Sequence, residues 1–382
     1  MQVALYNLEP VLALMGLALL VAGLPLAWFW RRHRLATPSQ RLKALTLLTL
    51  TLTFELVLVG AFTRLTDSGL GCPDWPGCYG SATPLGAVQH IGAAQAAMPT
   101  GPVTHSKAWI EMVHRYMAMG VGVLIIVLNV MTWRAWRQDR RQAVHPIWPA
   151  VTLFWVCLQG AFGALTVTMK LFPAIVSSHL MLAIGLLVLL CLQALRYEGW
   201  GSVAISAGQR LGLWLAVVLL GLQIALGAWV STNYAVLACS DFPTCQGQWW
   251  PEMNWAGFAL WRELGLGADG QPLPFAALAS IHYVHRSMAW LVLAVLLALG
   301  LNLRQLAGMA RPARVLLALC ALQLITGLSN VVLGWPLLAA VLHTGGASAL
   351  MLTLVWMLAL GRVAPLRLPH TQPPSDFSRP VA

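Results

Sequence analysis

Four histidines lie in apolar segments of this 382-residue chain, and their positions repeat. The segment EMVHRYMA aligns with HYVHRSMA, which pairs His114 with His285. A second segment, ending in SSH, aligns with one ending in VLH and pairs His179 with His343. Ionisable residues inside apolar membrane helices are costly and usually functional, and neutral imidazole is a common ligand of metals and of haem iron. We therefore predict two bis-histidine metal or haem sites, one in each copy of a duplication.

The duplication also includes a cysteine-bearing loop. Residues 61–78 (AFTRLTDSGLGCPDWPGC) align without a gap on residues 228–245 (AWVSTNYAVLACSDFPTC). Each copy has two cysteines six residues apart, namely Cys72 with Cys78 and Cys239 with Cys245. This spacing is wider than the CxxC of redox motifs, and outward loops of a membrane protein meet an oxidising compartment. We expect two structural disulfides, with a thiol relay as the alternative.

The composition of the chain indicates that these residues lie in a membrane protein. The chain is 59% hydrophobic and only 9% charged, and its apolar runs are continuous rather than alternating, which favours membrane helices over strands. A membrane-spanning helix needs about 20 apolar residues. Nine runs qualify, near 11–30, 45–65, 109–133, 147–168, 175–195, 211–233, 280–303, 313–334 and 338–361.

The net charge of +11 is explained by membrane topology and not by nucleic-acid binding. If the nine runs cross the membrane alternately, 17 of the 23 basic residues fall on one side, as the positive-inside rule requires. The N-terminus is then outside and the C-terminus cytoplasmic. The long loops 66–108 and 234–279 face outward, and all four histidines lie nearer the outer face.

The two copies differ one helical turn before their first histidine. Glu111 occupies the position that His282 has in the second copy. A carboxylate on the same helix face as His114 can carry a proton or orient a water, whereas the alternative is an ion pair with Arg115 or Arg64. We favour a functional role for Glu111.

Arginines stand beside the predicted sites. Arg115 and Arg286 each follow a histidine directly, and Arg64 ends the run 45–65. A guanidinium pairs well with a carboxylate such as a haem propionate, but it also extends toward lipid headgroups from a helix end. Both interpretations stay open for all three.

Together these segments resemble the haem A synthase family. The motifs are TRLTDSGLGCPDWPGCYG (63–80), EMVHR (111–115), SSH (177–179), VHRSMA (284–289) and LHTGG (342–346), and the likeness covers residues 45–361. It implies an all-α polytopic membrane protein with two pseudo-symmetric four-helix bundles. We expect an extra N-terminal transmembrane helix and basic linker (1–44), an N-terminal bundle (45–197), a C-terminal bundle (198–361) and a disordered cytoplasmic tail (362–382).

The resemblance also implies roles. The C-terminal bundle is expected to hold haem b on His285 and His343, and the N-terminal bundle to bind the substrate haem O through His114 and His179, with Glu111 as the acidic residue important for activity. The implied reaction oxidises the C8 methyl of haem O to the formyl of haem A by successive hydroxylations. The implied setting is the bacterial inner membrane and terminal oxidase assembly, with haem O synthase as substrate donor, an unidentified electron partner and possible homo-oligomers.

Two other function classes fit part of the same pattern. A di-haem b electron-transfer cytochrome would use the four histidines without changing its haems. A quinone-linked thiol oxidase would use the outward cysteine pairs and need no haem. A transporter built from repeats is a weaker candidate, because no helix here is interrupted as transporter helices are.

Overall fold

The computed structural model describes residues 9–140, 144–197 and 201–363, and within these ranges nine helices are long and apolar enough to span a membrane. They are α1 (Glu9–Arg32), α2 (Pro38–Leu65), α4 (His105–Gln138), α5 (Ile147–Thr168), α6 (Pro173–Ala194), α7 (Ala207–Thr232), α8 (Phe275–Leu303), α9 (Ala310–Val332) and α10 (Leu337–Leu360). The predicted all-α polytopic fold is confirmed.

The remaining elements are short and were not predicted. Helix α3 (Val88–Ala97) and the 3-10 turns η1 (Pro84–Ala87) and η2 (Trp255–Phe258) lie in the two long loops. A parallel pair of three-residue strands, β1 (Val203–Ile205) and β2 (Gly361–Val363), joins the linker between the halves to the end of α10. The predicted tail boundary at residue 362 is therefore wrong by two residues, since Arg362 pairs with Ala204 in this ladder. The rest of the predicted tail lies outside the described residues.

Both halves begin with the same local device. Helix α2 is capped by Thr37, whose hydroxyl accepts from the Gln40 backbone while the Gln40 side chain accepts from the Thr37 backbone. Helix α7 has the same capping box, made by Ser206 and Gln209. A capping box satisfies two backbone donors that a helix start leaves free, so it fixes where the chain enters each bundle.

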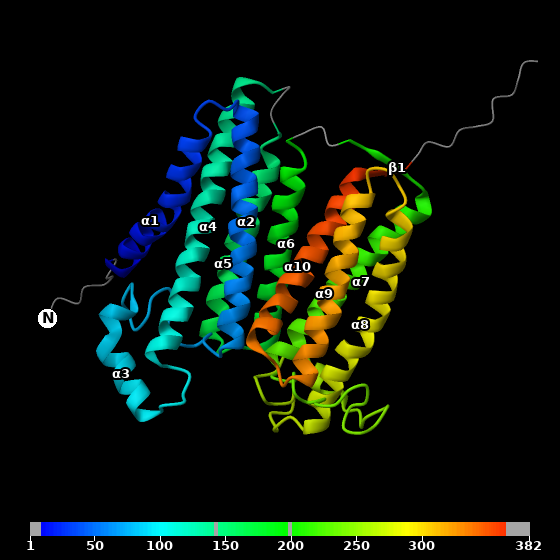
Figure 1. Ribbon diagram of the computed structural model, residues 1–382. Helices are drawn as coiled ribbons and strands as arrows, with labels where there is room; N and C mark the ends of the chain where they lie inside the picture. The colour runs from blue at the N-terminus through cyan, green and yellow to red at the C-terminus, as the bar shows by residue number, and fades with distance from the viewer. Residues whose placement is uncertain (1–8, 141–143, 198–200, 364–382) are drawn as a thin grey trace, which may run out of the picture.

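The eight helices after α1 form two bundles related by pseudo-two-fold symmetry (Figure 1). In the first bundle α2 packs on α4 and α6, and α5 packs on α4 and α6; in the second, α7, α8, α9 and α10 repeat the arrangement. Between the bundles, α2 meets α10 and α6 meets α7. Helix α1 packs on α4, outside the repeated set.

The symmetry axis is visible at the level of single hydrogen bonds. Arg64 donates to the backbone oxygen of Ser231, which lies 167 positions further along the chain. Ser231 is the residue that aligns with Arg64 in the second copy. Tyr234 likewise donates to Asp67, also 167 positions away, at 2.6 Å. In a two-fold interface counterparts meet only at the axis. The loop ends of α2 and α7 therefore lie on it.

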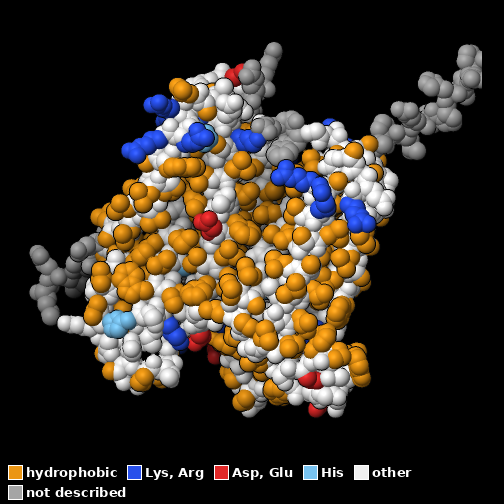
Figure 2. Space-filling model, viewed as in Figure 1, with side chains coloured by type: hydrophobic (Ala, Val, Ile, Leu, Met, Phe, Trp, Pro, Cys, Tyr) orange, Lys and Arg blue, Asp and Glu red, His pale blue; other side chains and the backbone are white. Residues whose placement is uncertain are grey.

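The ends of the molecule differ in charge. Both long loops lie at the same end of the bundles, below in Figure 1, where α4 and α8 begin. In Figure 2, which has the same view, most of the visible lysine and arginine side chains gather at the opposite end. The last turn of α1, which contains Arg31 and Arg32, lies at that end as well. The space between is covered mainly by hydrophobic side chains, as a lipid-facing belt requires, with an acidic side chain visible among them.

This separation of charge predicts the orientation in the cell. In a Cys157→Ser background, Trp250→Cys in the second long loop should react with a membrane-impermeant thiol reagent on intact cells, because the loop end carries few basic residues. Leu35→Cys, in the basic linker after α1, should react only after lysis. Both positions are well exposed, at 71% and 91%, so access to the reagent is matched. The reverse labelling pattern would contradict the predicted topology.

Candidate functional site

The four predicted histidines start from equivalent places in the fold. His114 lies on α4, His179 on α6, His285 on α8 and His343 on α10, and each falls within about the first three turns of its helix. All four helices begin at the loop end of the molecule (Figure 1). Within each bundle the two imidazoles are close enough to interact electrostatically, His114 with His179 and His285 with His343.

Each imidazole ring lies against a glycine of the preceding membrane-spanning helix. A methyl group at any of these glycines would approach the ring carbon Cε1 to between 2.9 and 3.2 Å, closer than normal van der Waals contact. The pairs are Gly60 with His114, Gly163 with His179, Gly227 with His285, and Gly327 with His343. Sequence analysis did not identify these glycines as part of the sites, although they repeat in register with the histidines.

In the second bundle both rings have polar partners at Nδ1. The hydroxyl of Thr326 lies 2.9 Å from Nδ1 of His343, and Gln323 donates to the backbone oxygen of the same histidine at 2.9 Å. The side-chain amide of Gln223 lies 3.1 Å from Nδ1 of His285 and 3.1 Å from its backbone oxygen.

The first bundle lacks these contacts. The Nδ1 atoms of His114 and His179 are buried and have no hydrogen-bond partner. Gln159, the aligned counterpart of Gln323, lies 3.5 Å from Nε2 of His179 instead. Sequence alignment predicted equivalent histidines, and the structure shows that their surroundings differ.

These features fit a haem better than a bare metal ion. Among the described residues no group of three or more His, Cys, Asp or Glu side chains could hold a metal, whereas zinc sites need three or four protein ligands. Two imidazoles on the second and fourth helices of a bundle form the usual axial pair for haem iron. Haem b, expected on His285 and His343, fits the donors present there.

Glu111 connects α4 to the first cysteine loop. Its carboxylate is 3% exposed, accepts the backbone N–H of Cys72 at 2.8 Å and forms an ion pair with Arg115. In the second bundle His282 makes the same connection, accepting the N–H of Cys239 at 3.3 Å. The two copies therefore use different side chains for one structural contact, and only the first places a carboxylate there.

The arginines beside the sites also bind the cysteine loops. Arg115 donates to the backbone oxygens of Asp74 and Gly77, at 3.0 and 2.6 Å. Arg286 donates to the counterparts of that loop, the oxygens of Asp241 and Thr244, at 2.8 and 2.6 Å. Pairing of either arginine with a haem propionate stays a prediction, and it would have to use donors that these bonds leave free.

Arg64 lies between the two halves of the chain. Its guanidinium stacks 4.1 Å above the ring of Tyr234 and donates to Ser231, while its Nε is buried without a partner. The Arg64 side chain therefore connects the end of α2 to the end of α7. The predicted contact with a propionate is not tested by these bonds.

Both expected disulfides are formed. Cys72 bonds to Cys78 and Cys239 to Cys245, and all four residues are fully buried. An aspartate closes each loop: Asp74 accepts two backbone N–H groups, and Asp241 accepts the corresponding two. The Thr244 hydroxyl and these backbone donors lower the pKa of Asp241 to about 2. The loops are thus tightly built lids over the histidine ends of the helices.

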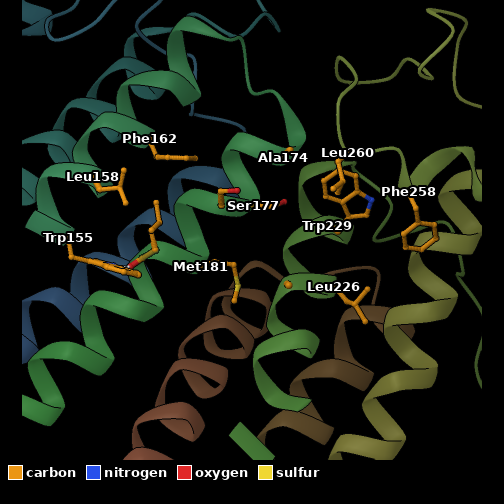
Figure 3. Close-up of a pocket in the computed structure, with 13 residues that line it drawn as sticks. Trp155, Leu158, Phe162, Ala174, Ser177, Met181, Leu226, Trp229, Phe258 and Leu260 are labelled. Atoms are coloured by element: carbon orange, nitrogen blue, oxygen red, sulfur yellow. Dashed lines mark hydrogen bonds between the residues drawn. The ribbon is translucent and has the colours of Figure 1, made fainter. Parts of the chain in front are cut away.

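An apolar cavity of about 680 Å³ lies beside the first site, where the two halves meet (Figure 3). Helix α5, helix α6, helix α7 and the turn η2 supply its walls, with side chains that include Phe162, Ser178, Met181, Leu226, Trp229 and Phe258. Ser178 precedes His179 directly. Ser177, which also lines the cavity, bonds to Thr232 of α7 at 3.1 Å and ties the halves together there.

Comparison with known proteins shows the family of the chain. Residues 43–355 match the COX15-CtaA family, described as cytochrome oxidase assembly proteins. The chain belongs to this family. The matched range contains all four histidines and both cysteine loops, and it begins after α1, which supports the prediction that α1 is an addition to the shared core.

Several relatives in this family have the name haem A synthase. That of Shewanella oneidensis is 37% identical over 313 residues, which cover 81% of this chain and 93% of the relative. That of Rhizorhabdus wittichii is 27% identical over 350 residues (85% and 95%), and that of Halalkalibacterium halodurans is 27% identical over 316 residues (80% and 92%). The resemblance found in the sequence motifs is confirmed.

The contact between glycine and histidine gives a direct test of the second site. Gly227→Ala would place a methyl group 2.9 Å from Cε1 of His285, so the ring must move and the purified protein should lose most of its haem, measured as the haem-to-protein ratio. Gly221→Ala, on the same helix, meets no atom closer than 4.0 Å and serves as the control. Equal haem content in the two variants would contradict the proposed position of His285.

Proposed function

We propose that this protein is a haem A synthase, an oxidoreductase of the bacterial inner membrane that converts haem O to haem A. The observation that carries the proposal is the pair of neighbouring histidines in each bundle of a chain whose relatives have this name. We further propose that His285 and His343 hold a resident haem b and that His114 and His179 bind haem O.

The reaction requires an oxidant, because the C8 methyl at the porphyrin edge has no acidic proton that a base could remove. Two successive hydroxylations of this methyl, each a two-electron oxidation, followed by loss of water give the formyl group. When bound, haem b supplies one-electron redox chemistry in the second bundle. The residues of the first bundle hold the substrate in a fixed position, and the surrounding apolar side chains exclude water from it.

Glu111 is the proposed proton carrier. It lies one turn before His114 on the same face of α4, and its two oxygens already accept from Cys72 and Arg115. The ion pair with Arg115 and the bond from Cys72 fix the carboxylate at the edge of the site. We propose that Oε2 takes up a proton released during oxidation of the methyl and passes it toward the loop end.

The cysteine pairs do not support the thiol oxidase alternative. Thiol–disulfide exchange requires access of an attacking thiolate to a sulfur atom. All four cysteines are fully buried within the loops, and each loop is bound by an arginine, Arg115 or Arg286. The di-haem cytochrome alternative is distinguished from the synthase by whether the protein converts haem O to haem A.

The proposed partners follow from the chemistry. Haem O is hydrophobic, so a membrane-bound haem O synthase is the proposed donor, and terminal oxidase assembly is the proposed destination of the product. An electron partner outside this chain is also proposed, because oxidation of the methyl group releases electrons that must be passed on.

Expression of the protein in cells that make haem O provides the main test. Extracted haems should include haem A, detected by chromatography and mass. His343→Ala protein should lack haem b and make no product, because the resident redox group is lost. His114→Ala protein should retain haem b and also make no product. Unchanged haem O with the intact protein would leave an electron-transfer cytochrome as the function.

The role of Glu111 has its own test. Glu111→Gln keeps a side-chain oxygen for the Cys72 N–H but removes the charge, so haem content should stay normal while conversion falls, by a factor of about 10² or more. His282→Gln makes the matched change at the aligned position of the second bundle and should convert haem O normally. Normal conversion by Glu111→Gln would show that this carboxylate only holds the loop.

A further inference from the structure

The second bundle fixes one tautomer of His343. The hydroxyl of Thr326 donates its proton to the backbone oxygen of Leu322 at 2.7 Å. Its lone pair is therefore left to accept from Nδ1–H of His343, 2.9 Å away. With the proton on Nδ1, the lone pair of Nε2 is free to bind iron, which is the tautomer an axial ligand needs.

His285 is held in a related way by α7. Gln223 lies one turn before Gly227, the glycine against which the His285 ring packs. Its amide nitrogen donates to the backbone oxygen of His285 and lies 3.1 Å from Nδ1, so it ties α7 to the helix turn that bears the ring. Unlike the Thr326 hydroxyl, this nitrogen is a donor and does not place the proton on Nδ1. The two histidines that would hold haem b thus each have a polar partner, or anchor, on a neighbouring helix.

The first bundle has apolar residues at both anchor positions. Alignment of LQGAFG with LQLITG places Phe162 at the position of Thr326, and the ungapped alignment that pairs Gly60 with Gly227 places Leu56 at the position of Gln223. Neither side chain has a polar atom. This replacement accounts for the buried Nδ1 atoms of His114 and His179, which have no partner.

We propose that Gln223 and Thr326 are positioning residues that make the second haem permanent, and that Leu56 and Phe162 keep the first site exchangeable. The inference rests on the proposed function, in which one haem is a cofactor and the other is a substrate that must leave as product. Partners of metal-binding histidines typically change metal affinity 10- to 100-fold. Because the first site lacks both of these partners, a haem bound there should leave sooner than a haem bound at the second site.

The cavity beside the first site is consistent with exchange. Phe162, the counterpart of Thr326, is one of its lining residues, and most of the others are also apolar (Figure 3). Where the second bundle has a hydroxyl that holds its ligand, the first has an aromatic wall of an apolar space. A large apolar macrocycle meets no polar barrier on this side.

Haem release from the full-length protein tests the proposal without turnover. Protein loaded with haem b at both sites is mixed with excess apomyoglobin, which captures released haem, and the release is followed optically. Wild-type protein should show a fast and a slow phase. His114→Ala should remove the fast phase and His343→Ala the slow one, which assigns each phase to a site.

Each variant at an anchor position should then change the rate of one phase of haem release. Thr326→Val should accelerate the slow phase about tenfold and raise the reduction potential of that haem, because an Nδ1–H that donates to no acceptor leaves a weaker ligand. Thr326→Ser should restore both values. Gln223→Leu should likewise accelerate the slow phase. Phe162→Thr should slow the fast phase, an outcome that does not depend on the stability of the Thr326 variants.

Thr353→Val is the matched control. The hydroxyl of Thr353 also donates to a backbone oxygen four residues earlier, at 2.8 Å, but contacts no histidine. Unchanged slow phases and potentials in Thr326→Val and Gln223→Leu would overturn the proposal. If these variants behave as expected but the protein does not convert haem O, the anchors are real and the proposed function is wrong.

Discussion

The structure depends on the cost of placing an imidazole among apolar helices. A neutral ring inside a membrane bundle needs space against a neighbouring helix, and each buried nitrogen without a partner adds to the cost. The space comes from a glycine on the preceding membrane-spanning helix, repeated four times: at Gly60, Gly163, Gly227 and Gly327. Because the histidine helices all start from the same end, these four contacts place both pairs near the cysteine loops.

The loops complete the sites from outside. Arg115 and Arg286 each bind several backbone oxygens of a disulfide loop, and Glu111 and His282 bind the backbone of its first cysteine. A change in loop structure is therefore transmitted directly to the helix turn that bears a histidine. The carboxylate of Glu111 serves this structural contact and the proposed proton transfer together.

Duplication produced a scaffold in which few changes distinguish the halves. The pseudo-two-fold packing, the capping boxes, the glycines and the disulfides are shared. The differences lie at three aligned positions around the rings: Glu111 against His282, Leu56 against Gln223, and Phe162 against Thr326. Each changes the polar contacts of a site without changing its framework. Under the proposed function, these differences would let one fold hold one haem firmly and release another.

The sequence by itself determined the membrane helices, the duplication, the histidine pairs, the disulfides and the family. Continuous apolar runs and identical spacings carry this information locally, because a helix must span the bilayer and aligned copies must fold alike. Only the tertiary structure decided which atoms contact each histidine. Gln223 lies 62 residues from His285, and Thr326 lies 17 residues from His343, so these contacts arise from helix packing. The same packing assigned Arg115 and Arg286 to the loops, since a guanidinium takes whichever oxygens the folded chain brings within reach.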